Sequence, residues 1–484
     1  MDISPPQHPL PRFPRAHAHA SFVLWLLMLA GLVATSKGQT TFIKADNTDA
    51  MNLATSYTAN SGVPGAADTI QFDSTLTAAR TAVLGGSFSI NAITVPTNYA
   101  QRFTFGSTTG AALTIGAGGI TKTNTTQGLY FSCSVALGAN QTWNIAGNNL
   151  VFNGPTPAIT DNGHNVNVTG GGTLELRPAA ALACGSNWTI NCNQVNINAA
   201  TADVTFGGAN TFKTLFIIVG TAEGSSFPVD TNTATSSNFG NASSGTIIFG
   251  LNTTTPATLI YNGNTASTPK TFTYDTRSTG TATINVSTAG QTLTLTSNLL
   301  LSNGTSQTSD KSWNFGGAGN LTLNGAVTNA SGSSFKIGIT KNDAGTLTLA
   351  GANTYSGNTN INGGTLAMTG TGSIANTPLI SLAGGTTFDV SGLSSGSFTL
   401  GSGQTLASSS ASAAALKGNV NASQGTLSMS VNGTAPAFTI GSGTLTVSSS
   451  TVFQINSGIG APGTYPLIAP TTGGKVTGTV PPIT

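Results

Sequence analysis

The stretch Gly345–Gly370 reads GTLTLAGANTYSGNTNINGGTLAMTG and contains two copies of one short pattern. Gly345-Thr-Leu-Thr-Leu349 opens it, and Gly364-Thr-Leu-Ala-Met368 repeats the same order of residue types 19 positions later. In each copy the apolar residues are two positions apart, the period of a β-strand with one buried face. Self-similarity at a fixed short period indicates stacked turns of similar shape. The stretch holds no Asp, Glu, Lys, Arg, His or Cys, so it predicts a fold and carries no ionisable chemistry.

The same five-residue pattern recurs along the chain, beginning at Gly172, Gly245, Gly319, Gly345, Gly364, Gly425 and Gly443. The last two copies are 18 residues apart. Strands this short cannot bury an inner face alone, so neighbouring turns must stack. We therefore predict an all-β fold, a parallel β-helix or β-solenoid. At about 20 residues per turn the chain would make on the order of 20 turns, and a rod of about 100 Å follows from the spacing of stacked strands.

A chain of β-sandwiches is the alternative architecture. Asn-Gly pairs are the strongest short signal for antiparallel hairpins, and they occur at positions 153, 162, 262, 303, 324, 362 and 432. However, the motif spacing is that of stacked turns, and connectors such as Ala350–Asn358 are longer than a two-residue hairpin loop. The solenoid is the favoured prediction.

The composition excludes several classes of protein. Only 6% of the 484 residues are charged, against about 25% in ordinary soluble domains, and the formal net charge is +2. There are 61 Gly, and 38% of residues are hydrophobic, mostly single apolar residues between Thr, Ser and Asn. A nucleic-acid or anionic-membrane partner is therefore not expected, because such partners select basic surfaces.

Three segments are predicted. Residues 1–38 have the order of a secretory signal peptide: Arg12 and Arg15, the apolar run Ser21–Ala34, then small residues before a cut ahead of Gln39. Because the run is shorter than the ~20 residues a membrane span needs, no stable span is expected in the mature chain. Residues 39–95 are less regular and predict an N-terminal cap-like β segment, since terminal repeats are atypical. Residues 96–484 are predicted to form the β-solenoid repeat region, with a complete and a C-terminally truncated region as alternatives.

The central stretch also carries a family resemblance. Ala352–Leu366, preceded by Gly345–Gly351, is similar to the autotransporter-associated β-strand repeat, in which a leucine-bearing strand, an Asn-Thr-Tyr-Gly turn and a second Gly-Thr-Leu strand follow one another. The match is one full copy, with partial likeness elsewhere. It implies an exported bacterial passenger built as a parallel β-helix, secreted or at the cell surface. Family members end in a membrane barrel or a sorting tail; residues 465–484 resemble neither, so we expect free secretion or a downstream anchor.

The three tryptophans after the leader, Trp143, Trp188 and Trp313, share one context: Trp, a polar residue, then an apolar one. One interpretation is an aromatic platform on which sugar rings stack. Strand alternation instead places each Trp on the same face as the apolar residue two positions on. An inward, core-filling role is therefore favoured.

Single reactive residues give no site. His164, the one imidazole after the leader, lies in a polar turn without an obvious orienting partner. Cys184 and Cys192 either form a disulfide, leaving Cys133 unpaired, or pack with it as small buried side chains, the slightly favoured interpretation. Asp68 and Asp73 lack the dense oxygen series of a calcium loop and are interpreted as turn residues. We predict no catalytic, cofactor-binding or metal-binding residue and no cofactor.

Two functions remain. The first is a non-catalytic structural or adhesive rod whose Thr, Ser and Asn surface makes many weak contacts with polysaccharide or with cell-surface and matrix components. The second is a polysaccharide lyase or glycosidase, which needs carboxylates or a base around the substrate. Acids are spread singly, at Asp161, Glu175, Asp203, Glu223, Asp230, Asp275, Asp310, Asp343 and Asp389. Glu175 with Arg177, and Asp275 with Arg277, are two apart and predict surface ion pairs.

Overall fold

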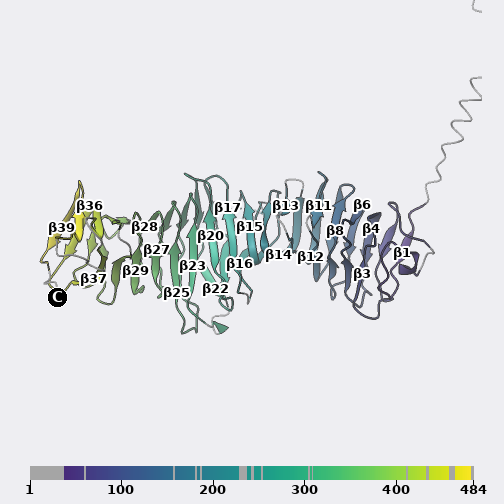
Figure 1. Ribbon diagram of the computed structural model, residues 1–484, viewed down its shortest axis with the longest axis horizontal. Helices are drawn as coiled ribbons and strands as arrows, with labels where there is room; N and C mark the ends of the chain where they lie inside the picture. The colour runs from purple at the N-terminus through teal and green to yellow at the C-terminus, as the bar shows by residue number, and fades with distance from the viewer. Residues whose placement is uncertain are drawn as a thin grey trace, which may run out of the picture. The chain divides into compact units, whose positions relative to one another are not determined.

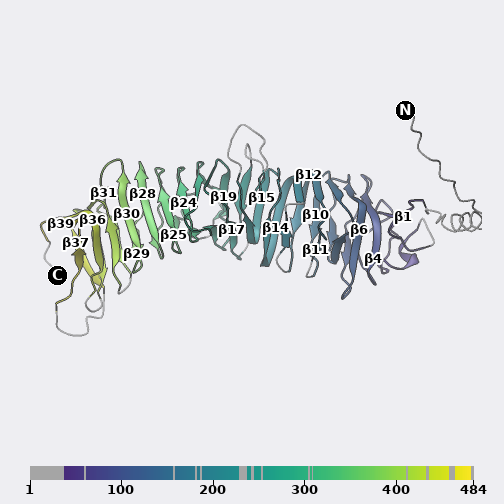
Figure 2. The same ribbon diagram turned by 90° about the horizontal axis from the view of Figure 1, so that it is seen from above.

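Residues Thr41–Thr484 form one compact unit in a computed structural model of the chain, and Met1–Thr40 are separate from it. The structure describes residues 38–58, 62–155, 158–179, 182–185, 188–227, 237–240, 245–251, 254–302, 306–307, 309–409, 412–431, 435–456 and 464–480, without the side chains of 200–202. The predicted signal peptide therefore lies almost wholly outside the described residues. Within the unit, strands follow one another in sequence order from β1 to β39 (Figure 1, Figure 2).

The strands stack in columns, each strand hydrogen-bonded to a strand one turn away. The first column is β1 (Thr41–Ile43), β2 (Thr69–Gln71), β4 (Phe88–Val95), β6 (Ala112–Lys122), β9 (Gln141–Ile145), β12 (Val166–Leu176) and β14 (Trp188–Phe206). The second is β3 (Arg80–Val83), β5 (Phe103–Gly106), β7 (Leu129–Phe131), β10 (Asn149–Phe152), the end of β12, the middle of β14, the start of β15 (Thr214–Gly224), β16 (Thr246–Phe249), β19 (Thr271–Asp275) and β22 (Leu299–Ser302).

The third column has two runs. Early turns give the start of β4 and of β6, then β8 (Ser134–Leu137) and β11 (Ile159–Thr160). The later run is β13 (Leu182–Cys184), the ends of β14 and β15, β17 (Ala257–Tyr261), β20 (Ala282–Val286), β23 (Lys311–Gly316), β25 (Ile337–Lys341), β27 (Thr359–Ile361), β29 (Leu379–Leu382), β32 (Thr405–Ser408), β35 (Thr426–Ser430) and β37 (Val452–Asn456).

A separate 12-stranded sheet lines the C-terminal half. Its strands are β18 (Ala266–Thr268), β21 (Thr292–Leu295), β24 (Asn320–Leu323), β26 (Thr346–Leu349), β28 (Thr365–Gly370), β30 (Thr387–Leu393), β33 (Ala414–Lys417), β36 (Phe438–Val447) and β38 (Ile468–Pro470), with β31 (Phe398–Thr399), β34 (Val420–Asn421) and β39 (Gly474–Gly478) joined through the end of β36. The one described helix is the 3₁₀ turn η1 (Ala54–Ser56).

All strand pairs among the described residues are parallel, apart from two isolated antiparallel bridges. Antiparallel hairpins would have been required for β-sandwiches, so the prediction of an all-β parallel solenoid is confirmed. The stack makes about 15 turns. Our expectation of about 20 was wrong because the 19-residue step is a short one: Leu347 pairs with Leu366, but Leu321 pairs with Leu347, 26 residues on. At about 4.8 Å per turn, 15 turns rise about 70 Å.

The two copies of the opening pattern pair with each other. β26 and β28 lie side by side, with Leu347 opposite Leu366 and Leu349 opposite Met368. These four side chains are buried in the core. A Cβ on Gly345 would come 1.8 Å from the carbonyl oxygen of Gly319 in the preceding turn. The glycine is therefore needed because successive corners stack without room for a side chain.

The interior is filled by the inward residues of each strand, and its N-terminal half contains an aromatic stack. Phe105, Phe131 and Phe152 stack with ring centroids 4.8 and 4.9 Å apart, and Trp143 continues the stack at 4.9 Å from Phe152. Such contacts repeat at the spacing of the turns and add to the apolar burial.

The first turns come from residues 39–95, the segment predicted as a cap. β1, β2 and β4 belong to the first column, and β3 begins the second. Met51 and Tyr57, from the connection after β1, are buried; the N–H of Met51 donates to the carbonyl of Val83, and the Tyr57 ring packs on Phe42 at 5.5 Å. This connection therefore packs against the first strands.

Candidate functional site

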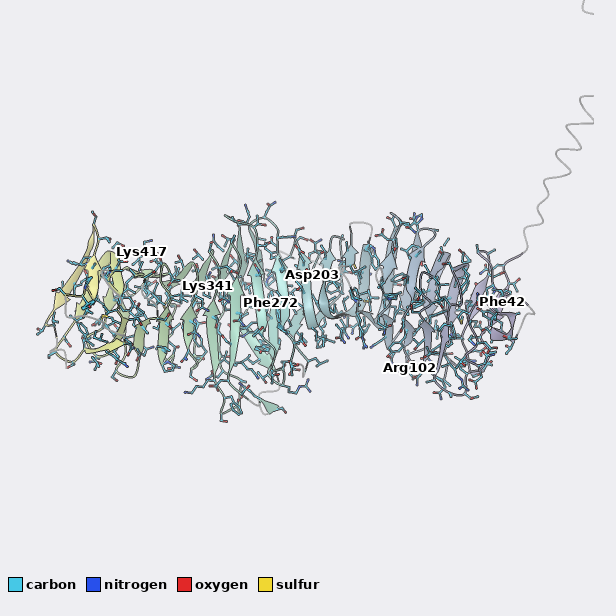
Figure 3. All side chains as sticks on the ribbon, viewed as in Figure 1. Phe42, Arg102, Asp203, Phe272, Lys341 and Lys417 are labelled. Carbon is cyan, nitrogen blue, oxygen red and sulfur yellow. The ribbon has the colours of Figure 1, made fainter. Side chains whose placement is uncertain are left out.

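The outer surface of the first column carries ladders of polar side chains. β9 alternates strictly, with Gln141, Trp143 and Ile145 buried and the residues between them exposed. Because the strands are in register, exposed residues of successive turns align: Thr142 lies opposite Asn167, which lies opposite Thr189. Side chains project outward along the whole stack (Figure 3). Hydroxyl and amide groups are thus repeated at the spacing of the turns.

A shallow groove of about 530 Å³ crosses this surface. It is lined by Ala117, Gly118, Thr121, Asn140, Gln141, Thr142, Asn165, Val166, Asn167 and Thr189. The corner of β6 is hollow because Ala117 and Gly118 are small, whereas the next two turns present Asn140 and Asn165 at their corners. The side-chain oxygen Oδ1 of Asn140 accepts a hydrogen bond from the backbone N–H of Asn165 at 2.8 Å, which holds the Asn140 side chain in place.

The groove offers hydrogen bonds and no charge. None of its lining residues is ionisable. Within the part of the chain that the structure describes, the side chains of Thr142, Asn167 and Thr189 form no hydrogen bond, so their donors and acceptors face solvent. Such a surface can bind a neutral polar ligand, and it supplies no acid or base for a reaction.

The two predicted ion pairs exist, but their carboxylates are buried. Arg177 Nη2 lies 2.7 Å from Glu175 Oε1, and Arg277 Nη2 lies 2.6 Å from Asp275 Oδ2. The acidic side chains are only 4% and 3% exposed, against 38% and 37% for the arginines. The prediction of surface pairs was therefore half wrong. The stacked strands bury each carboxylate, whereas the arginine that pairs with it remains partly exposed.

Stacking does not place the strand acids beside one another. The register partners of Glu175 are Val151 and Asn196, and Asp275 lies opposite Ser302. Glu223 lies between Thr205 and Ile260, and Asp389 lies 2.8 Å from the ammonium of Lys417. These acids are placed one to a turn and hold local structure. Asp230 lies outside the described residues.

The other residues singled out in the sequence occupy turns. Asp68 Oδ2 accepts the N–H of Gly65, and Asp73 Oδ1 accepts the N–H of Thr75. His164 closes a turn, because its backbone N–H donates a hydrogen bond to the backbone carbonyl of Asp161. No group of three His, Cys, Asp or Glu side chains in the described ranges has the geometry to hold a metal ion.

The cysteines and tryptophans are inside the stack. Cys133, Cys184 and Cys192 are buried and free, as the favoured interpretation predicted. Burial raises the pKa of the Cys133 thiol to about 12 and that of Cys192 to about 11, so both stay protonated. Trp143, Trp188 and Trp313 are fully buried, which confirms the core-filling interpretation and removes them as a sugar platform.

Buried lysines are the feature that the sequence analysis missed. Lys341, labelled in Figure 3, directs its ammonium at the carbonyl oxygens of Asn342, Asp343 (2.9 Å) and Gly363 (3.3 Å). Lys122 likewise binds the carbonyls of Asn124 (2.7 Å) and Gly147. Each lysine thus ties its own corner to the next turn. The signal was present in the sequence, since Lys341 follows Ile337 and Ile339 at inward positions of the alternation.

Comparison with known proteins bears on the centre of the chain. Residues 339–368 match the family model of the passenger-associated-transport-repeat, and they include β26, β27 and the first four residues of β28. These residues are thus similar to one repeat of autotransporter passengers, within a chain that folds as a parallel β-helix. Such a repeat implies export to the cell surface or the extracellular space. No curated protein and no solved structure matches the chain.

No helix in the described residues has the length and apolar character needed to cross a membrane.

Proposed function

We propose that this protein is a non-catalytic extracellular rod, a passenger that adheres to polysaccharide or to cell-surface and matrix components. The observation that carries the proposal is the outer surface: in-register ladders of neutral hydroxyl and amide side chains above a continuous stacked core. The passenger-associated-transport-repeat supports export, and residues 1–38 would act as a cleaved signal peptide.

The ladders suit adhesion because they repeat one weak contact many times. A single neutral hydrogen bond at a wet surface adds little net binding free energy, since water competes for the same groups. Contacts placed on one rigid scaffold act together, and the second and later contacts form at a high effective concentration. A rod of about 15 turns can therefore hold a long polymer through contacts that are individually weak.

The test uses the purified chain in two assays. We expect it to bind bacterial or host cells, or a panel of insoluble polysaccharides, and to leave the polymers intact. Absence of binding to all of these surfaces would contradict the adhesive role. Release of reducing ends or of unsaturated sugars from any polymer would contradict the non-catalytic role, because both reflect bond cleavage.

A further inference from the structure

The groove on β6, β9, β12 and β14 is extended along the stack. Its exposed lining residues Thr142, Asn167 and Thr189 are in register on three successive turns of the first column. Half-buried Thr121 lines the groove from the turn before them, where it lies opposite Asn144. Three steps of about 4.8 Å make a track about 15 Å long. A single small ion would fill a fraction of this length, so the shape fits an extended oligomer with a repeating unit.

The chemistry of the walls selects the kind of oligomer. Hydroxyls and amides both donate and accept hydrogen bonds, as sugar hydroxyls do. An anionic polymer would lose part of its hydration here without meeting a cation, which costs free energy. At the β6 end the groove is lined by the small residues Ala117 and Gly118, so a ring can approach the backbone closely there.

From these observations we propose that the groove binds a neutral, extended polysaccharide, with the sugar chain lying along the stack across the turns of β6 to β14. The hydrogen-bonding groups of Thr142, Asn167 and Thr189 hold the sugar hydroxyls, and Asn140 and Asn165 border the chain at the corner. The proposal rests on the adhesive function proposed above and assigns it a site and a ligand class.

The test compares groove variants with a matched ladder elsewhere. Thr142→Ala, Asn167→Ala and Thr189→Ala are combined in one variant; the control combines Thr258→Ala, Asn314→Ala and Thr283→Ala, which are also in register, on β17, β23 and β20. Binding to soluble dextran, mannan and laminarin is measured by calorimetry or on immobilised protein. We expect the groove variant to bind its preferred neutral glycan at least about tenfold more weakly, and the control to bind within about twofold of the wild type.

A second variant tests the cavity without removing any wall group. Ala117 is exposed, so Ala117→Gln adds a neutral side chain to the groove and should also weaken binding. Circular dichroism melting confirms that each variant is folded. Raising NaCl from about 0.05 M to about 0.5 M should leave affinity unchanged, because no charge pair is involved.

Three results would overturn the proposal: unchanged glycan binding by both groove variants, absence of binding to neutral glycans by the wild type, or tighter and salt-sensitive binding to polygalacturonate or single-stranded DNA. The cell-adhesion assay separates these results from failure of the general function. A groove variant that adheres normally would refute this site and leave the adhesive rod in place.

Discussion

At the scale of single residues, burying a lysine ammonium carries a desolvation cost that its contacts must offset. Taking an ammonium out of water is unfavourable unless its donors are satisfied. The ammonium groups of Lys341 and Lys122 donate hydrogen bonds to backbone carbonyls of two successive turns. The corners of a solenoid concentrate carbonyl groups that strand pairing leaves over, and a lysine can satisfy several of them at once.

Replacing Lys341 by Met should therefore destabilise the protein. The variant keeps the apolar stem but removes the donor to the carbonyls of Asp343 and Gly363, and we expect a loss of about 1–3 kcal/mol in the free energy of unfolding. Urea denaturation followed by circular dichroism measures it. Lys213→Met, at an exposed lysine, is the control and should change stability by less than about 0.5 kcal/mol. Equal effects of the two variants would mean that the corner contacts contribute nothing.

The buried carboxylate of Glu175 makes a second prediction at this scale. Glu175 accepts hydrogen bonds from Arg177 and, at 3.0 Å, from the side-chain amide of Asn149. Arg177→Ala leaves the covered acid with less compensation, so it should cost about 1–3 kcal/mol, more than the 0–1 kcal/mol of an exposed pair. Lys417→Ala, which breaks the more exposed pair with Asp389, is the comparison. A smaller loss for Arg177→Ala than for Lys417→Ala would contradict this ranking.

At the scale of the strand, alternation decides which substitutions matter. In β26 the residues Leu347 and Leu349 are buried, and Thr346 and Thr348 are partly exposed. Leu347 is stacked between Leu321 and Leu366 of the adjacent turns. One strand thus presents a packed face and a wet face within four residues.

Leu347→Ala should lower the free energy of unfolding by about 2–5 kcal/mol, because neighbouring turns cannot close the cavity without breaking the register of the backbone. Thr348→Ala, one residue away and facing outward, should change it by less than about 0.5 kcal/mol. Thermal and urea unfolding of the two variants provide the measurement. Comparable losses would show that the stack does not depend on its inward leucines.

At the scale of the whole molecule, the buried ionisable groups predict how stability depends on pH. Burial lowers the pKa of Lys44, Lys122 and Lys341 to about 8 and that of Lys270 to about 7, from 10.5 in an exposed lysine. Between about pH 7 and pH 10 the unfolded chain therefore binds more protons than the folded one. These lysines therefore contribute a free energy of unfolding that rises with pH over this range.

Buried acids of high pKa reverse the trend at higher pH. The pKa of Cys133 rises from 9.0 to about 12 and that of Tyr274 from 10.0 to about 12, both through burial. Above about pH 9 these groups ionise in the unfolded chain first, so stability falls again. We expect maximum stability near about pH 9, measured by urea denaturation across the pH range. A maximum below pH 7 would contradict the lysine assignment, and Lys341→Met should flatten the rise on the acid side of the maximum.

The sequence by itself determined the fold class. Apolar residues two apart, glycine before each strand and the echo within Gly345–Gly370 specify short parallel strands in stacked turns, because only stacking buries such strands on one face. The same alternation placed the three tryptophans inside. It also excluded dense chemistry in the repeats, which hold almost no ionisable groups.

Only the tertiary structure decided the features that depend on contacts between successive turns. The number of turns, the burial of Glu175 and Asp275, the corner contacts of Lys341 and the groove beside Asn167 all depend on which residues of successive turns become neighbours. Corner lengths vary from turn to turn, so residues from 18 positions apart (Asp203 and Thr221) to 37 positions apart (Gly220 and Ala257) are brought into register. Residue spacing within one strand does not encode that register, and the candidate site therefore emerged only when the strands were stacked.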